Sequence, residues 1–324
     1  MNNKITDATI LVTGGAGFVG SYVIEELLLH QPKKIRIIDN LIRGSFYNMH
    51  SYINNPIVEF IEGDVRDAAL LEKCISGCDY VFHMAALRIN ACAANQQDGF
   101  DVMLQATFNV AEFCKKHAIK KVIYSSSASV YGLAQNFPTP ETDNSYNNQT
   151  FYGAAKMWGE QLFRSYKFMH DLDYVALRYF NVYGERMDTD GKYTEVMIKW
   201  LDCIRDNKAP AIFGDGSDTM DFVHVKDVAH SNILALLADV TDETFNVGVQ
   251  RETSLKELLE TILKVNNCQL EPVFKEANSV NPVKKRIADL SKINKLLGYQ
   301  PSITLEQGLK SLSDWYFNLQ QESK

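Results

Sequence analysis

The chain has 324 residues, of which 46% are hydrophobic and 23% are charged, so it can bury one large core or two fused smaller ones. Its formal net charge of −7 argues against nucleic acid or an anionic membrane as the main partner. No apolar run approaches the ~18 residues needed to span a bilayer, and the first residues lack a signal-peptide pattern. We therefore expect a cytoplasmic protein without membrane contact, whose six scattered cysteines are reduced thiols.

Short apolar runs alternate with longer amphipathic segments along the first part of the chain. Six of these runs are predicted to be strands, at residues 9–13, 34–39, 58–63, 80–86, 120–126 and 174–184. Because they are apolar throughout and separated by helical patterns, they predict an α/β fold with a Rossmann-type, doubly wound parallel sheet. After about residue 185, short strands and a Gly-rich turn predict a smaller C-terminal α/β lobe. We expect the doubly wound domain over 1–180 and the smaller lobe mainly over 181–324, with room for the chain to cross between them.

A glycine-rich turn follows the first predicted strand, in the sequence ILVTGGAGFVGSYVIEELLL. Gly14, Gly17 and Gly20 would allow a tight turn, close approach of the backbone to a pyrophosphate, and close packing of the next helix. The second strand ends at Asp39, whose carboxylate can accept from both ribose hydroxyls of NAD and would repel the extra phosphate of NADP. Arg43 lies nearby and leaves NADP as a minor alternative. The remaining alternative is a glycine turn in a Rossmann-like domain that binds no cofactor.

A carboxylate also follows the third predicted strand. Asp64 can accept a hydrogen bond from an adenine amino group, with Val65 against the ring. The alternative is that Asp64 caps the N-terminus of a helix.

Tyr152 and Lys156, in the sequence FYGAAK, are four residues apart and would share one face of a helix. A free tyrosine has a pKa near ~10, which is too high for a base at neutral pH. A neighbouring ammonium group and the nicotinamide cation would favour the phenolate. Tyr152 is therefore a candidate general base for a substrate hydroxyl.

Other polar residues near these motifs are predicted to be structural. His83 is flanked by apolar residues and is expected to be a buried, hydrogen-bonded imidazole, and Asp227 is expected to cap a helix N-terminus. Cys74 and Cys78 are four residues apart, but no second pair supports a zinc site, so no metal is expected.

The motifs TGGAGFVG, DN at 39–40, GDV, HMAAL, SSSASVYG, YGAAK and RYFNVYG occur in this order. The chain thereby resembles the extended short-chain dehydrogenase/reductase family, and within it the nucleotide-sugar epimerases and dehydratases of the UDP-galactose 4-epimerase type. The resemblance covers nearly the whole chain and implies NAD as the cofactor and a nucleotide-diphosphate sugar as the substrate. It thereby implies an NAD-binding domain over 1–180 and a substrate-binding lobe mainly over 181–324. The further cofactor-site positions that it implies are Phe18, Val19, Asn40, Gly44, Met84, Ala85, Ala86, Arg88, Ser125 and Tyr179.

The resemblance also implies roles in the reaction. Tyr152 would be the base, Lys156 would tune its pKa and contact the ribose, and Ser127 would bind a sugar hydroxyl. Asn181 would contact the substrate. Arg88 falls where UDP-galactose 4-epimerases have a lysine facing the cofactor, so it is expected at both the cofactor and the substrate.

The two residues after the serines separate the reactions within this family. The family's 4,6-dehydratases carry Asp and Glu there, as the acid and base that remove water, whereas this chain has Ala128 and Ser129. The resemblance therefore favours a 4-epimerase that works through a transient 4-keto sugar. The alternatives are decarboxylation, net oxidation or reduction at C4, or dehydration by other residues, and more distantly a non-catalytic dinucleotide sensor.

The expected anchor for the diphosphate departs from the family pattern. Met220 stands where these epimerases often have an arginine, and the second arginine, of an Arg-x-Gly-Asp stretch, is missing. Lys284, Lys285, Arg286 and Arg186 are the available cations. Arg286 is our choice for the anchor, with Arg186 as a second substrate contact, and the alternative is a solvated basic turn. Phe213 is expected either to contact the base or to lie in the core.

Family members pair through two helices, which would here span residues 105–117 and 152–169. Both segments carry more apolar residues than one buried stripe needs, so a homodimer is expected.

Overall fold

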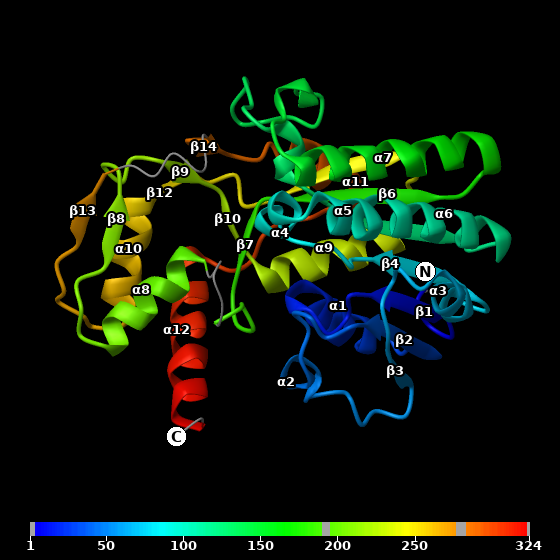
Figure 1. Ribbon diagram of the computed structural model, residues 1–324, viewed down its shortest axis with the longest axis horizontal. Helices are drawn as coiled ribbons and strands as arrows, with labels where there is room; N and C mark the ends of the chain where they lie inside the picture. The colour runs from blue at the N-terminus through cyan, green and yellow to red at the C-terminus, as the bar shows by residue number, and fades with distance from the viewer. Residues whose placement is uncertain (1–3, 190–194, 277–282, 323–324) are drawn as a thin grey trace.

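The computed structural model describes residues 4–189, 195–276 and 283–322 (Figure 1). Its main element is a seven-stranded sheet in the order β11-β6-β5-β4-β1-β2-β3, in which every neighbouring pair is parallel. The strands are β1 Thr9–Thr13, β2 Lys34–Asp39, β3 Val58–Glu62, β4 Tyr80–His83, β5 Lys121–Ser127, β6 Tyr174–Tyr179 and β11 Glu243–Val247. The predicted Rossmann-type sheet is thus confirmed. The strand order reverses between β1 and β4, and a crevice opens beyond the carboxyl ends of strands at such a point.

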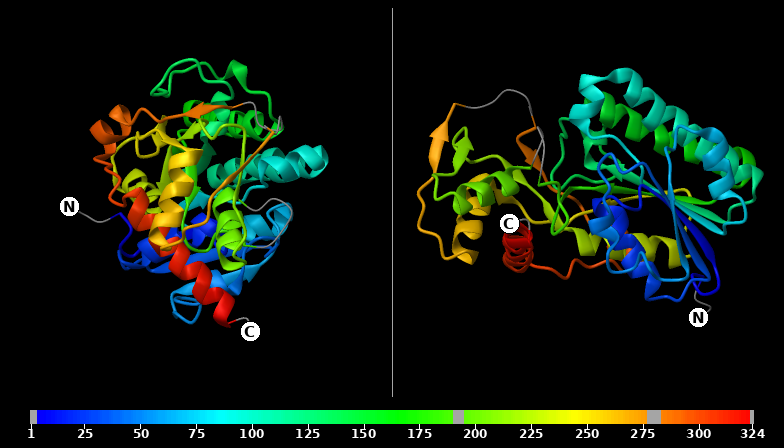
Figure 2. Two further views of the ribbon diagram at one scale, coloured as in Figure 1. Left: turned by 90° about the vertical axis from the view of Figure 1, so that its left-hand side faces the viewer. Right: turned by 60° about the horizontal axis from the view of Figure 1, so that its bottom comes forward.

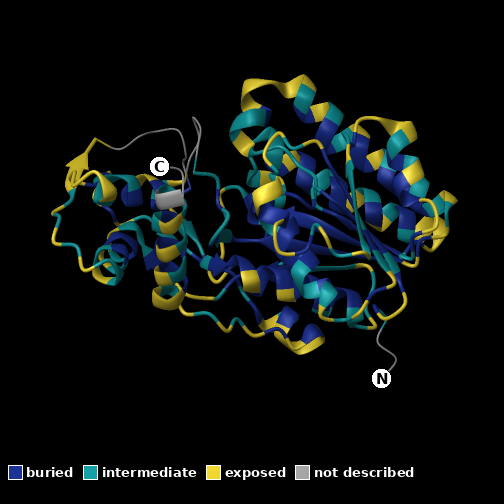
Figure 3. Ribbon diagram, turned by 90° about the horizontal axis from the view of Figure 1, so that it is seen from below, coloured by how far each residue is buried: buried dark blue, intermediate teal, exposed yellow. Residues whose placement is uncertain are grey.

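Helices cover both faces of this sheet, because successive residues of a strand point to opposite faces. Ile10 and Val12 of β1 pack with α1 Phe18–Leu28 and α9 Val225–Leu237 on one face, whereas Leu11 packs on the other. The helices of that second face are α3 Ala68–Ile75, α6 Ala106–Lys116 and α7 Phe151–His170. Figures 2 and 3 show the layers from other sides, with the strands buried between the helices.

A smaller lobe lies beside the carboxyl ends of the strands and has a core of its own. Its paired strands are β7 Asn181–Tyr183 with β10 Phe222–His224, β8 Ala211–Phe213 with β13 Val273–Lys275, and β9 Thr219–Met220 between β12 Thr253–Ser254 and β14 Lys285–Arg286. Its helices are α8 Val196–Arg205, α10 Leu255–Val265 and α12 Leu305–Glu322. The short helices elsewhere are α2 Phe46–Met49, α4 Ile89–Ala94, α5 Gln96–Gly99, a π-helix Phe100–Gln105, 3-10 turns Ala128–Tyr131 and Ser145–Asn147, and α11 Ser291–Leu297.

The chain crosses between the two lobes more than once after residue 180. It enters the second lobe at β7, returns to the sheet with α9 and β11, leaves again with α10, and comes back to β11 with α11. None of the helices in the described part of the chain is long and apolar enough to cross a membrane.

Two predicted strands are wrong in their extent. The run 80–86 is a strand only as far as His83. The run 174–184 forms two strands, β6 and β7, rather than one. Phe180 N–H still donates to Val247 O of β11, but Asn181 N–H donates to Asp221 O at 3.0 Å. The backbone therefore changes partners at residue 181, where the first crossing to the second lobe begins.

Candidate active site

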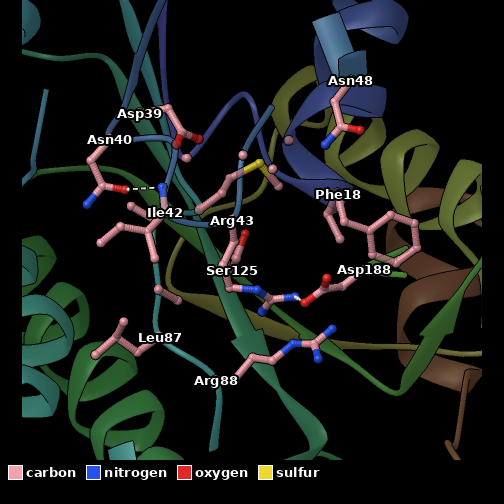
Figure 4. A pocket seen from close by; sticks show the side chains of 18 of the residues that line it. Phe18, Asp39, Asn40, Ile42, Arg43, Asn48, Leu87, Arg88, Ser125 and Asp188 are labelled. Atoms are coloured by element: carbon pink, nitrogen blue, oxygen red, sulfur yellow. Dashed lines mark hydrogen bonds and ion pairs between the residues drawn. The ribbon is translucent and has the colours of Figure 1, made fainter. Parts of the chain in front are cut away.

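A pocket of about 600 Å³ opens beyond the carboxyl ends of the central strands, at the expected switch point (Figure 4). Every residue that the sequence assigned to the cofactor lies on its wall: Gly14, Gly17, Phe18, Val19, Gly20, Asp39, Asn40, Gly44, Asp64, Val65, Met84, Ala85, Ala86, Arg88, Ser125, Tyr152, Lys156 and Tyr179. These residues come from positions 14 to 179, and the fold gathers them around one space large enough for a dinucleotide.

The glycine turn leaves its backbone open to a ligand. Gly14 has φ +70°, and a Cβ there would lie 2.9 Å from the Ala85 backbone. A Cβ on Gly20 would lie 2.4 Å from Gly14 O, so a side chain there would push α1 away from the turn. Gly17 caps α1 without a side-chain hydrogen bond, and the N–H groups of the first turn can therefore bind a pyrophosphate. The turn fits the phosphates of a dinucleotide.

Asp39 closes β2 and shapes the loop that follows it. Its carboxylate accepts hydrogen bonds from Ala16 N–H at 3.0 Å and Leu41 N–H at 2.9 Å. Burial raises its pKa, and these backbone N–H groups act in the opposite direction. Arg43, whose charge could have served a 2′-phosphate, instead pairs with Asp188 at 3.3 Å (Figure 4). The site is therefore better suited to NAD than to NADP.

Asp64 follows β3 and lies on the wall of the pocket. Arg66 donates to it from Nε at 2.9 Å and Nη2 at 2.7 Å, and Asn40 donates at 2.8 Å. The Arg66 hydrogen bonds are the main reason that the pKa of Asp64 falls to about 2. The cap of α3 is Asp67, which accepts from Leu70 N–H, so the alternative role of Asp64 as a helix cap is not observed.

Tyr152 and Lys156 lie on the first turns of α7, which begins after the cap residue Thr150. Lys156 is 3% exposed, and its Nζ donates to Ser125 O at 2.6 Å and lies 5.8 Å from the centre of the Tyr152 ring. Burial lowers the pKa of Lys156 to about 8. Burial raises the pKa of Tyr152, whereas a hydrogen bond with Ser127 opposes this rise.

The three serines at the end of β5 have different partners, because alternate residues face opposite sides of the sheet. Ser125 Oγ lies 3.1 Å from Tyr179 OH on the pocket side. Ser127 Oγ accepts from Ser129 N–H at 3.1 Å and lies at the end of the strand, next to Tyr152. Ser126 instead donates to the buried Glu160. This middle serine is therefore a structural residue.

A buried ion pair that no sequence pattern indicates contacts Ser126. Glu160 of α7 and Arg178 of β6 are 3% and 7% exposed and form two hydrogen bonds, Nε–Oε1 at 2.9 Å and Nη2–Oε2 at 2.6 Å. Arg178 also donates to Tyr131 OH at 2.8 Å and Glu141 O at 2.9 Å. The pair ties the helix that carries Tyr152 to the sheet.

Two contacts from the second lobe reach across the cofactor pocket. One is the Arg43–Asp188 ion pair. The other is the hydrogen bond that Trp315 Nε1–H of α12 donates to Tyr47 OH of α2 at 3.0 Å, and both residues line the pocket. Neither contact could be read from the sequence, because Trp315 and Tyr47 are 268 residues apart.

The residues assigned to the substrate are more dispersed. Arg186 donates to Ser21 Oγ at 3.1 Å and to Glu25 Oε1 at 2.6 Å, and therefore lies against α1 on the wall of the cofactor pocket. Asn181 Nδ2–H donates to Asp221 O at 3.3 Å. Phe213 is 52% exposed on β8.

Arg286 lies beside Met220, its register partner on the neighbouring strand. Its charge lowers the pKa of Tyr152, as does that of Arg88, so both guanidinium groups are within electrostatic reach of the phenol. Arg88 also forms an ion pair with Glu195 at 3.6 Å.

The structural assignment of His83 is confirmed. Its ring nitrogens lie 2.9 and 3.0 Å from Thr13 Oγ1 and Thr107 Oγ1, and burial lowers its pKa to about 3. The assignment of Asp227 as a helix cap is wrong, because His224 caps α9. Asp227 lies in the first turn and accepts from Ser302 N–H at 2.9 Å, which joins α9 to the segment before α12.

The six cysteines are free thiols. Within the described ranges, no group of three or more His, Cys, Asp or Glu side chains could hold a metal ion.

Comparison with known sequences places these features among nucleotide-sugar enzymes. The model of the "NAD dependent epimerase/dehydratase family" matches residues 10–248. A putative UDP-glucose 4-epimerase of Methanocaldococcus jannaschii is 35% identical, over 95% of this chain and 98% of that protein. A UDP-glucose 4-epimerase of Mycolicibacterium smegmatis is 32% identical, over 96% and 99%. A UDP-N-acetyl-alpha-D-glucosaminuronate decarboxylase of Bacillus cytotoxicus is 28% identical, over 96% and 98%.

Solved structures agree with this result. The UDP-N-acetylglucosamine 4-epimerase of Methanobrevibacter ruminantium, in complex with UDP-N-acetylmuramic acid, has a TM-score of 0.91 and 33% identity, covering 97% of this chain and 99% of that one. The UDP-glucuronic acid 4-epimerase of Bacillus cereus, in complex with UDP-glucuronic acid and NAD, has a TM-score of 0.84 and 28% identity, covering 96% and 99%.

Proposed function

Because the chain belongs to the NAD-dependent epimerase/dehydratase family and NAD is its cofactor, we propose that it is a nucleotide-sugar 4-epimerase that acts on UDP-linked sugars. The observation that supports the proposal is that Tyr152 and Lys156 line the NAD pocket and that Ser127, hydrogen-bonded to Tyr152, precedes two residues that cannot perform dehydration. The UDP moiety is proposed because the related epimerases are named for UDP-sugars.

Tyr152 acts as the general base and acid at the sugar's O4. It accepts the proton of the 4-hydroxyl and returns it at the end of the cycle. Lys156 and the nearby arginines favour the phenolate against the effect of burial. NAD, when bound, supplies a hydride acceptor at C4 and gives the same hydride back. Return of the hydride to the opposite face of the 4-keto sugar inverts C4 without net oxidation.

The chain's own residues argue against 4,6-dehydration. Ala128 and Ser129, at the positions of the acid and base of that reaction, are 2% and 7% exposed in the short 3-10 turn after β5. A methyl group and a serine hydroxyl do not transfer the protons needed to remove water across C5 and C6. The rival candidate is another reaction through a 4-keto sugar, above all decarboxylation, because one relative bears that name.

Two further proposals concern assembly. The second lobe, mainly residues 181–324, would hold the nucleotide diphosphate, since residues of this lobe, among them Arg186 and Trp315, line the pocket. Two copies would associate through α6 and α7, because Phe108 on α6 is 40% exposed and Phe168 and Met169 on α7 are 93% and 60% exposed.

The direct test is incubation of the purified protein with NAD and a panel of UDP-sugars, read by NMR at C4. Tyr152→Phe should lower turnover by at least ~10²-fold, the scale of a lost general base, and leave NAD bound. Tyr166→Phe is the matched control on the same helix, because the Tyr166 hydroxyl donates to Glu112, away from the pocket. It should change turnover by less than about 2-fold, since no catalytic proton passes through it. Turnover of Tyr152→Phe close to that of the wild type would refute the assignment of the base.

A further inference from the structure

Arg286 is a partly exposed cation without a matching anion in the part of the chain that the structure describes. Its Nε is inaccessible to solvent and has no hydrogen-bond partner, and no ion pair joins Arg286 to a described carboxylate. Burial lowers its pKa. A buried N–H without a hydrogen-bond partner is costly, so this side chain is suited to a ligand that brings an acceptor and the missing negative charge.

The neighbour on the same strand shows the contrast. Lys285 lies one residue earlier on β14 and pairs with Glu252 at 2.9 Å, with side chains 38% and 42% exposed. Arg286 points to the other side, as alternation along a strand requires. Its main electrostatic partner is Tyr152, whose phenolate it would stabilise.

The electrostatic interaction between Arg286 and Tyr152 indicates which part of a substrate Arg286 can meet. Under the proposed function, Tyr152 contacts O4 of the sugar. The diphosphate is attached at C1, across the ring from C4, whereas the C6 substituent is carried by C5, next to C4. The group that approaches both Tyr152 and Arg286 is therefore on the C4–C6 side of the sugar.

A neutral 6-hydroxymethyl group would leave the guanidinium charge unpaired. A carboxylate at C6 would match it, because the planar guanidinium fork binds carboxylate oxygens through parallel N–H···O hydrogen bonds. Arg88 adds a second positive charge near Tyr152, which is partly offset by Glu195, a side chain 53% exposed. The local charge thus favours an anionic sugar.

We propose that Arg286 is a specificity residue that binds the carboxylate of a nucleotide-linked uronic acid, so that the enzyme prefers acidic to neutral hexoses. This inference rests on the proposed function, because it uses Tyr152 to locate the sugar. It also differs from the sequence-based expectation, in which Arg286 binds the diphosphate.

Binding measurements separate these two roles. Calorimetry would compare UDP, UDP-glucose and UDP-glucuronic acid in the Tyr152→Phe background, where the sugars are not converted. Adding Arg286→Gln should lower the affinity for UDP-glucuronic acid by about 10- to 100-fold, the scale of a lost charge-assisted hydrogen bond. The affinities for UDP and UDP-glucose should change by less than about 2-fold, because these ligands lack the carboxylate. Lys285→Gln is the matched control and should leave all three affinities unchanged.

An equal loss of affinity for all three ligands would overturn the proposal and assign Arg286 to the diphosphate. Unchanged binding of UDP-glucuronic acid would also overturn it. Circular dichroism and thermal unfolding of each variant would establish that the fold is retained, and Arg286→Lys, which keeps the charge, should restore part of the affinity.

Turnover provides an independent readout. The wild type should convert UDP-glucuronic acid with a kcat/KM at least ~10²-fold above that of UDP-glucose, because a buried charge left unpaired discriminates strongly, and Arg286→Gln should bring the two values together. If Arg286 only lowered the pKa of Tyr152, the variant would turn over both sugars more slowly and its activity would recover at high pH, which would contradict the proposal.

Inversion of UDP-glucose alone would refute the preference for acidic sugars but support the assignment as an epimerase. Carboxylate-selective binding without inversion of any sugar would refute the epimerase but support Arg286.

Discussion

Replacement of Glu160 by alanine would remove one side of the buried ion pair that holds α7 against β6. Both side chains are at most 7% exposed, so Arg178 would keep its charge in a space that water does not fill. Loss of one partner from such a pair costs about 3–5 kcal/mol. Arg178 retains two acceptors, Tyr131 OH and Glu141 O, and we therefore expect a loss near the lower end, about 3 kcal/mol.

Urea unfolding followed by circular dichroism would measure this loss as a lower midpoint at an unchanged slope. The matched control is Glu306→Ala, which removes an ion pair with Lys264 whose side chains are 58% and 68% exposed. Exposed pairs contribute less than about 1 kcal/mol. A double variant, Glu160→Met with Arg178→Met, should be more stable than either single variant, because no charge is left buried. A Glu160→Ala protein within about 1 kcal/mol of the wild type would refute the description of this pair as dry and tightly coupled.

Two further predictions concern the cofactor and the assembly. Asp39→Ala should weaken the binding of NAD and reduce the discrimination against NADP, because it removes the carboxylate that ends β2. Fluorescence titration with both cofactors measures the two affinities, and an unchanged preference would mean that the ribose is held elsewhere. In light scattering at micromolar concentration, the wild type should show about twice the chain mass of 36.7 kDa. Phe168→Glu should show the mass of one chain, because Phe168 is 93% exposed on α7, in the proposed interface. A wild-type mass of 36.7 kDa would contradict the dimer.

The sheet and the cofactor pocket could be predicted because their signals are local. Gly14, Gly17 and Gly20 have backbone roles that follow from their spacing, and Asp39 is placed by the end of its own strand. Parallel strands that are buried on both faces can be recognised in the sequence as continuous apolar runs. The pocket then follows from where such strands end.

The contacts that the sequence did not predict have a different cause, because they depend on partners that are distant in sequence. Arg186 is held at α1 by Glu25, which is 161 residues away. The break in the run 174–184 is set by Asp221 of the second lobe, to which Asn181 turns. No pattern near Arg186 or Asn181 encodes these contacts.

Arg286 illustrates the limit most clearly. The sequence analysis chose Arg286 from four candidate cations as the diphosphate anchor, but the pairing of β14 with β9 decides which side chain of the strand turns toward Tyr152. Lys285 and Arg286 have similar chemistry in the sequence, but only Lys285 has an ion-pair partner among the described residues.

In the proposed reaction, C4 is inverted by transfer and return of a hydride that never exchanges with solvent. The most direct test is turnover of UDP-sugars in D₂O, with the product examined by NMR and mass spectrometry. Tyr152 moves only the proton on O4, and no residue at Ala128 or Ser129 can take one from C5. We therefore predict an inverted C4 with no deuterium on C4, C5 or C6. Deuterium on any of these carbons, a 6-deoxy product, or release of CO₂ would contradict the account.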